Sequence, residues 1–342
     1  MMIFPTYRLT FGSPLHIGER GVGLEETRVH VPADTLFSAL CSVWRELYDV
    51  EALRRDVLDW FTEDEGGSEP FFLSSAFPFA GSVRFFPKPL AWLNVTDKAF
   101  KRVRFVSESI FTDLVSGQTP TFSEADCVNG KTVWVTAEDK KKLAGWMDET
   151  TDDIVLWRRD VVPRVTLDRI TSASELWHLG EMKFSAGVGL WFAVAFHQGH
   201  GETLRSKFEA CLRVLGDTGL GGERGTGHGL FISDYAGEEA LPDVAEPNRF
   251  VTLAPLCPKH TGQLTALTNE AASYDLLPRR GWVTSPEAKN LRRKMVWMFA
   301  EGSVLTGNPE PRAGGLVNVK PDVCPHDVWR YGYAFPVGMT SS

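Results

Sequence analysis

The sequence has no apolar run that approaches the roughly 18–20 residues of a membrane-spanning helix. Its first residues, MMIFPTYRLTFGSP, contain no basic n-region, no apolar h-region and no small-residue cleavage site, so we expect no signal peptide. Cysteine is scarce, and the five residues are odd in number and widely scattered: Cys41, Cys127, Cys211, Cys257 and Cys324. This pattern favours reduced thiols over a disulfide framework, so we expect a cytoplasmic protein without membrane contact.

Metal-ligating motifs are incomplete. Cys257-x-x-His260 and Cys324-Pro-His326 are the only hints of zinc ligation, and a complete site needs about four correctly spaced ligands. We therefore expect no metal ion.

Strong positive charge is also absent. The net charge of −8 argues against a protein that coats nucleic acid over its whole surface. The charge is uneven, however: Asp49–Glu69 carries eight acids and two arginines, whereas Arg279–Lys294 carries six basic residues and one acid. Such runs are commonly solvated faces, but the second one leaves room for a local basic groove.

One stretch, DTGLGGERGTGHGLFI at 217–232, is unusually rich in glycine and has only Arg224 and His228 as basic members. A compact domain keeps dense glycines where backbone approaches something closely or takes φ > 0. Close backbone approach with free N–H groups suits an anionic partner such as phosphate. The dinucleotide and Walker loops run from strand to helix, whereas here a helix at 202–215 precedes the loop and a strand at 227–233 follows it. Neither GxGxxG nor GxxxxGK[ST] spacing fits the loop, so we expect no nucleotide cofactor.

The order of elements predicts an α+β fold. We expect a strand at 3–11, a helix that begins near Pro32 with Asp34 as N-cap, and an acidic helix at 50–62. Strands at 71–79 and 83–86 follow, and then a long insertion at about 95–180, a buried strand at 187–196, the 202–215 helix and the 227–233 strand. This is the βαββαβ order of a ferredoxin-like or RRM-like module.

The last part of the insertion, WRRDVVPRVTLDRITSASE, carries Arg158, Arg159, Arg164 and Arg169 among β-branched residues. It predicts an arginine-bearing β-hairpin that projects from the domain. Exposed arginines suit a nucleic-acid backbone. A solvated hairpin whose arginines pair with Asp160 and Asp168 explains the pattern equally well.

The loop after the first strand carries His16, Gly18 and Arg20. Loops of this kind often hold binding or catalytic side chains. His16 either packs in the loop or serves a function, as a contact to a phosphate or base or as a general acid or base.

The chain length allows two domains. We expect residues 1–236 to form the first, with its glycine-rich loop at 217–229. The acidic, proline-bearing segment at 237–248 is the expected linker, and residues 249–342 are expected to form a β-rich second domain.

Six segments together resemble the RAMP proteins of CRISPR systems, and among them the fourth, Cas-five-like Csm subunit of type III-A effector complexes. They are PADTLFSALCSVW (32–44), FFPKPL (85–90), GLGGERGTGHGLF (219–231), RRGWVTS (279–285), RRKMVWMFAEGSVL (292–305) and HDVWRYGYAFPVG (326–338). The glycine-rich segment is specific only to the superfamily. The segments from Arg279 onward indicate this subunit.

The resemblance implies two tandem RRM-like modules in a non-catalytic protein that holds the 5′ tag of a CRISPR RNA. It also implies a projecting thumb hairpin in the guide–target duplex, and docking of the large polymerase-like signature subunit and of a backbone RAMP subunit. By position, the glycine-rich loop would line the tag through Gly219, Gly221, Gly222, Arg224, Gly225, Thr226, Gly227 and His228, and the loop with His16, Gly18 and Arg20 would face the same groove. Arg158, Arg159, Arg164 and Arg169 would belong to the thumb, and further positive charge would come from Arg279, Arg280, Arg292, Arg293 and Lys294.

Two alternatives remain. The first is a metal-independent endoribonuclease of the same superfamily that cuts CRISPR precursor RNA, with His16 as general acid or base. Such an enzyme needs a base, an acid and a cation at one phosphate, and the sequence offers only His16 with Arg20 in one loop. The second is a nucleotide-binding enzyme, which conflicts with the order of elements around the glycines.

Overall fold

The computed structural model describes residues 2–18, 23–62, 68–92, 98–168, 170–171, 173–285, 287–288, 290–308 and 312–340. Its main sheet is built on β1 (Met2–Phe11), which lies between β12 (Val188–Phe196) and β13 (Phe231–Leu241) and is antiparallel to both. Strand β3 (Phe77–Ala80) pairs with the other edge of β12, so the order is β13-β1-β12-β3. With α1 after β1 and α6 after β12, the chain follows the βαββαβ order expected from the sequence.

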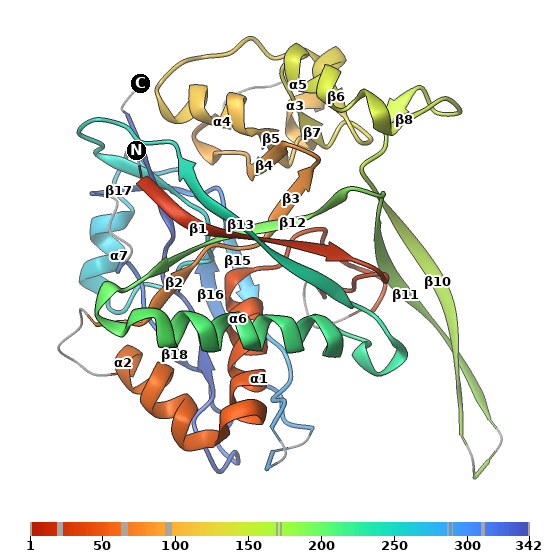
Figure 1. Ribbon diagram of the computed structural model, residues 1–342, viewed down its shortest axis with the longest axis vertical. Helices are drawn as coiled ribbons and strands as arrows, with labels where there is room; N and C mark the ends of the chain where they lie inside the picture. The colour runs from red at the N-terminus through yellow and green to blue at the C-terminus, as the bar shows by residue number, and fades with distance from the viewer. Residues whose placement is uncertain are drawn as a thin grey trace.

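Helices α1 (Ala33–Leu53) and α6 (Gly201–Thr218) lie together on one side of these strands (Figure 1). Their apolar stripes are buried in the main core, for example Leu36 on α1 and Phe208 on α6. The two helices expected at 32–47 and 50–62 are one kinked run. Asp49 leaves the helical conformation (φ 74°, ψ 176°), and a π-helical turn (Arg54–Leu58) and α2 (Asp59–Thr62) follow.

Asp34 is not the N-cap that the sequence suggested. Pro32 takes that position, and its side chain makes no capping hydrogen bond. The first helical N–H is satisfied from elsewhere in the fold, because Ala33 donates to Oγ of Ser75 at 2.9 Å. Asp34 is buried and has a long-range role that is described below.

The insertion extends the main sheet and then leaves it. Strand β4 (Val83–Pro87) pairs with β5 (Phe105–Ser107), β5 runs parallel to β7 (Val133–Trp134), and β6 (Cys127–Val128) closes this end. The accompanying elements are α3 (Lys98–Arg102), α4 (Glu108–Val115), α5 (Ala137–Lys142), the short pair β8 (Met147–Asp148) and β9 (Asp153–Ile154), and the 3-10 turns at Leu90–Trp92, Glu124–Asp126 and Ala144–Trp146.

Strands β10 (Trp157–Leu167) and β11 (Ser174–Phe184) form a long antiparallel hairpin that projects from the body of the molecule (Figure 1). The sequence predicted this hairpin. Beyond its base it exposes apolar side chains on one face, including Val165 (58% exposed), Leu167 (67%) and Leu176 (62%).

The C-terminal part is β-rich. Its sheet has the order β17-β14-β20, and two strand pairs, β15–β16 and β18–β19, accompany it. Its elements are β14 (Arg249–Thr252), α7 (Thr261–Leu267), β15 (Leu276–Arg279), β16 (Val296–Phe299), β17 (Val304–Thr306), β18 (Val317–Asn318), β19 (Trp329–Arg330) and β20 (Pro336–Met339). Among the described residues α7 is its only helix, so this part does not repeat the complete βαββαβ order that two tandem modules would require.

The boundary between the two parts also differs from the sequence-based expectation. Residues 237–241 of the expected linker are the last residues of β13, where Leu241 pairs with Met2 and Gly237 with Thr6. The core is continuous across the boundary. Strand β2 (Phe71–Leu73) contributes the Leu73 N–H, which donates to the Tyr331 hydroxyl at 3.0 Å. No helix within the described ranges is both long enough and apolar enough to cross a membrane.

Candidate nucleic-acid interface

The glycine-rich loop connects α6 to β13 through a short 3-10 turn, Arg224–Thr226. Two glycines explain why the chain needs this residue type here. A Cβ at Gly221 would lie 2.4 Å from the carbonyl oxygen of His16, and one at Gly229 would lie 2.0 Å from that of Leu220. Both residues also have positive φ, so any other residue type would be strained as well as crowded.

The loop uses several of its N–H groups within the protein. Gly222 donates to His16 O at 2.9 Å, Gly229 to Pro14 O at 2.8 Å and Leu220 to Gly229 O at 2.9 Å. The glycines therefore mainly allow the loop to pack on residues 14–18. This differs from the expectation that the dense glycines present free N–H groups to an anion.

The outer turn of the loop, residues 223–227, faces solvent. Arg224, Gly225, Thr226 and Gly227 are exposed, and a Cβ at Gly225 would meet no atom within 4 Å. Arg224 forms no ion pair with any described side chain, so its guanidinium is available to an external anion. The turn is nevertheless braced, because Thr226 donates to Glu223 O from both its N–H (3.0 Å) and its hydroxyl (2.9 Å).

His16 lies beneath this loop and is 4% exposed. Its Nδ1 lies 2.8 Å from the carbonyl oxygen of Gly180, and because a carbonyl only accepts, Nδ1 donates the hydrogen bond. A Cβ at Gly222 would lie 2.8 Å from Cδ2 of the ring, so the loop covers the imidazole. This burial favours the packing role over general acid–base catalysis. Gly18 lies beside the ring, and Arg20 lies outside the described residues.

His228 is also buried rather than presented to a ligand. Its Nε2 lies 3.0 Å from Oε1 of Glu181, and its Nδ1 lies 3.0 Å from the Thr226 hydroxyl. Glu181 is on β11, so His228 joins the glycine-rich loop to the hairpin. The expectation that His228 reaches an RNA phosphate or base does not fit these contacts.

Three hairpin arginines have partners within the chain, but not the ones considered from the sequence. Arg158 pairs with Asp148, and Arg164 donates to Glu181 at 3.0 Å. Arg159 donates to Glu25 O at 2.9 Å and lies 3.6 Å from Glu26. The two aspartates are used otherwise: Asp160 binds Lys183, and Asp168 accepts from the hairpin turn. Arg169 lies outside the described residues.

The basic run Arg279–Lys294 contains both buried and exposed side chains. Arg279 is 6% exposed and donates to both carboxylate oxygens of Asp34, at 3.0 and 2.9 Å. Arg330, which the sequence analysis missed, also binds Asp34. Arg293 lies beside this group, and burial together with the charge of Arg330 lowers its pKa to about 10. Arg279 is thus neutralised within the fold and does not supply surface charge, contrary to expectation.

The pKa of Asp34 lies below its usual value. Burial opposes ionisation of this carboxyl, but the charges of Arg279 and Arg330 and the hydrogen bonds from Arg279 outweigh burial. A buried carboxylate that stays ionised between two guanidinium groups is a structural clamp.

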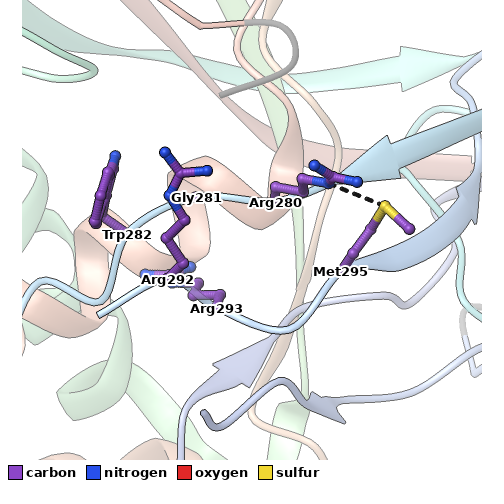
Figure 2. A pocket seen from close by; sticks show the side chains of 6 residues that line it. All are labelled: Arg280, Gly281, Trp282, Arg292, Arg293 and Met295. Atoms are coloured by element: carbon purple, nitrogen blue, oxygen red, sulfur yellow. Dashed lines mark hydrogen bonds between the residues drawn. The ribbon is translucent and has the colours of Figure 1, made fainter. Parts of the chain in front are cut away.

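The remaining arginines of this run line a small pocket of about 190 Å³ together with Gly281, Trp282 and Met295 (Figure 2). The Arg292 guanidinium lies over the Trp282 ring, 4.8 Å from its centroid, while Arg280 donates to Sδ of Met295 at 3.1 Å. Trp282 is 50% exposed. Exposed arginines beside an exposed indole suit a phosphate and a base. The adjoining Lys294 is exposed and paired with Asp322 at 2.6 Å.

Trp282 could not be singled out from the sequence, because the identity of a tryptophan does not reveal its burial: Trp44 and Trp191 are core residues, whereas Trp282 and Trp297 are exposed. Glu181 could not be singled out either, because a glutamate in a strand is usually a solvent-facing residue. Among the described residues, no three His, Cys, Asp or Glu side chains gather as metal ligands would.

Comparison with known proteins agrees with the sequence motifs. Residues 245–339 match the family model of the CRISPR Csm4 C-terminal domain. The "CRISPR system Cms protein Csm4" of Thermococcus onnurineus (strain NA1) is 27% identical over 307 residues, which are 90% of this chain and 91% of that protein. The protein of the same name from Mycobacterium tuberculosis (strain CDC 1551 / Oshkosh) is 25% identical over 313 residues, 89% of this chain and 88% of that protein.

Solved structures share the fold at low identity. A chain from the "Crystal structure of Csm3-Csm4 subcomplex in the type III-A CRISPR-Cas interference complex" superposes with a TM-score of 0.69 at 15% identity, covering 98% of this chain and 100% of that one. A chain from the "Crystal structure of Csm1-Csm4 cassette in complex with cA4" gives 0.61 at 19% identity, covering 100% and 99%. Residues 245–339 therefore carry a domain that matches the CRISPR Csm4 C-terminal domain, the chain is similar over about nine tenths of its length to two proteins named Csm4, and it shares its fold with the solved Csm4-containing structures.

Proposed function

We propose that this chain is a non-catalytic, RNA-binding subunit of a cytoplasmic type III-A CRISPR complex, where it holds the 5′ tag of the CRISPR RNA. The single observation that carries the RNA-binding role is the outer turn of the glycine-rich loop. There the exposed Arg224, which forms no ion pair with a described side chain, stands on a turn that is braced by internal hydrogen bonds. A cation on a preorganised turn contacts a phosphate with little loss of conformational freedom.

The Trp282 pocket is the second proposed contact. Single-stranded RNA is held by phosphate contacts and by stacking of splayed bases on aromatic or guanidinium planes. Arg292 covers one face of Trp282, so a base would stack on the remaining exposed surface while Arg280 contacts the adjoining phosphate. Arg280 and Arg292, rather than the buried Arg279, are thus the arginines proposed to contact RNA.

The β10–β11 hairpin is the proposed thumb. Apolar side chains that enter between base steps act as wedges in nucleic-acid complexes. The exposed Val165, Leu167 and Leu176 on one face of the hairpin, with Ile170 (94% exposed) in its turn, offer such a wedge to a guide–target duplex.

Docking to two protein partners completes the proposal. The structural neighbours come from a Csm3–Csm4 subcomplex and a Csm1–Csm4 cassette, which supports a backbone RAMP subunit and a large signature subunit as partners. The acidic surface balance fits a subunit whose basic contacts to RNA are local and whose other faces meet proteins.

Purification of the tagged full-length chain from its host, followed by sequencing of bound RNA and identification of bound proteins, tests the proposal. We expect RNAs whose 5′ ends share one repeat-derived tag, together with a large subunit and a backbone subunit. Recovery of the protein without RNA would contradict the RNA-binding role. The endoribonuclease alternative is tested separately, by incubating the chain with repeat RNA in a chelator. Cleavage that the His16→Ala variant abolishes would replace the structural role with catalysis.

A further inference from the structure

Glu181 is a buried carboxylate at the base of the hairpin, and three basic side chains surround it. Its side chain is 5% exposed. Oε1 accepts hydrogen bonds from His228 Nε2 and from Arg164 Nη2, both at 3.0 Å, and Oε2 lies 3.7 Å from Lys183 Nζ. Burial opposes its ionisation, but the hydrogen bonds from His228 and Arg164 outweigh burial and place the pKa of the carboxyl below its usual value.

The partners of Glu181 come from different segments. His228 is in the glycine-rich loop, three residues before β13, whereas Arg164 is on β10 near the distal half of the hairpin. In the strand register Arg164 lies opposite Trp177, so its side chain reaches back along the same face of the hairpin to Glu181. The Glu181 carboxylate on β11 therefore contacts both the glycine-rich loop and the β10 strand of the hairpin.

Gly180, the residue before Glu181, makes further contacts through its backbone at the start of the hairpin. Gly180 accepts from His16 Nδ1 at 2.8 Å and donates to Leu24 O at 2.7 Å. A Cβ at Gly180 would lie 2.2 Å from Glu25 O, so the backbone approach requires glycine. His16 O in turn accepts from Gly222 of the loop at 2.9 Å. Gly180 and Glu181 are thus where the hairpin, the His16 segment and the glycine-rich loop meet.

We infer that Glu181 is a positioning residue that locks the glycine-rich loop to the β10–β11 hairpin, so that both engage one RNA strand at a fixed separation; this inference rests on the proposed function. The outer turn carries Arg224, and the hairpin carries the exposed apolar face. A contact that fixes the loop relative to the start of the hairpin fixes the number of nucleotides between the two RNA contacts.

Glu181 is suited to this task because it is buried and its partners come from both segments. A buried carboxylate needs its partners, and replacement of Glu181 removes its contacts to the loop and to the hairpin at once. Asp160 lies directly opposite Glu181 in the strand register, but it is half-exposed and pairs with Lys183 at 2.9 Å. Asp160 therefore provides a matched carboxylate on the same hairpin with no contact to the loop.

A distance measurement in the full-length chain tests the coupling. Spin labels are placed at Gly225→Cys, where a side chain has open space, and at Ser174→Cys, at the exposed end of β11, in a Cys41→Ser background. We expect one narrow distance distribution in the unmodified chain and in Asp160→Ala, and a distribution at least twice as wide in Glu181→Ala. Glu181→Gln, which keeps an acceptor oxygen, should restore most of the narrow distribution. An unchanged width in Glu181→Ala would overturn the inference.

A second variant covers the case in which Glu181→Ala does not fold. His228→Leu removes the contact between the loop and Glu181 and leaves the Arg164–Glu181 contact within the hairpin, and we expect it to widen the distribution as well. The same variants are then assembled with CRISPR RNA, and the boundary of nuclease protection near the 5′ end is mapped. A protection boundary that lies at one nucleotide in the unmodified chain and spreads over several nucleotides in Glu181→Ala supports the inference. An unchanged boundary opposes it. If the unmodified chain retains no RNA, the proposed function fails, while the distance measurement still decides on the coupling.

Discussion

Asp34 and Arg279 form a buried, bidentate ion pair between residues 245 positions apart in the sequence. Asp34 is the second residue of α1, and Arg279 is the last residue of β15. Arg330 of β19 binds the same carboxylate, so two elements of the C-terminal part converge on the start of the first helix. The clamp thus joins the two parts of the chain, which also share one continuous apolar core.

Replacement of Asp34 should be among the most destabilising single changes in the chain. Asp34→Ala leaves Arg279 and Arg330 buried without a counter-charge, which typically costs about 3–5 kcal/mol in the free energy of unfolding. Urea denaturation followed by tryptophan fluorescence measures the change. Asp322→Ala is the control, because Asp322 is exposed and its ion-pair partner among the described residues is the exposed Lys294, and we expect no measurable change. Equal stability of the two variants would show that the clamp is unimportant.

Arg224→Ala should weaken RNA binding without affecting folding. The side chain is exposed and has no ion-pair partner among the described residues, so its loss removes no internal contact. One lost phosphate contact reduces affinity about tenfold and lowers the dependence of log K on log salt by roughly 0.7 for a single strand. Titration of labelled tag RNA at several salt concentrations measures both quantities. Arg213→Ala, which removes an exposed arginine of α6, should leave both unchanged, and an unchanged salt slope in Arg224→Ala would contradict the assignment.

Trp282→Ala should weaken RNA binding in a way that hardly depends on salt. Loss of base stacking on an aromatic ring costs about 1–3 kcal/mol of binding free energy, and the change is not electrostatic. Trp282→Phe should recover part of the affinity. Trp297 is equally exposed (54%) but lies outside the pocket, so Trp297→Ala provides the control. Equal losses in the two alanine variants would instead indicate a general effect of surface aromatics.

The elements of the first module were predictable because their signals are local. Alternation over 3–11 and the apolar stripes of the two helices depend only on neighbours in sequence. The end of β13 was missed because its last residues lie at the edge of the sheet. An edge strand that is half in solvent carries polar residues such as Glu238 and Glu239, so it lacks an apolar period.

Side-chain roles that depend on distant partners could not be predicted. By local rules, Asp34 after Pro32 reads as a helix cap and Arg279 as part of a basic surface run. Each is half of a pair that only the tertiary fold brings together. His228 differs from the expectation for the same reason, since its contact with Glu181 joins a loop to a strand 47 positions earlier.

The last prediction concerns Glu301, which makes stability depend on acid pH. Glu301 Oε1 accepts from the Ser75 hydroxyl at 2.8 Å and lies 3.4 Å from His30 Nε2, and its side chain is 5% exposed. Burial opposes ionisation, but the nearby charges of His30 and Arg28 outweigh it and lower the pKa of Glu301 to about 2. Because the folded-state value lies below the unfolded one, the contribution is present above pH 4.5 and is lost as the pH falls toward 2. The difference between the unfolded value of 4.5 and the folded value of about 2 corresponds to about 3 kcal/mol in the free energy of unfolding.

Glu301→Gln should therefore lower the free energy of unfolding near neutral pH and flatten its fall between pH 4.5 and 2. Urea denaturation at a series of pH values gives the difference between the variant and the unmodified chain, which should shrink steadily as the pH falls through this window. Glu270→Gln, a change at an exposed carboxylate, should follow the unmodified chain at every pH. A constant difference for Glu301→Gln across the window would show that its role is packing rather than charge, because a lost packing contact costs the same in either protonation state.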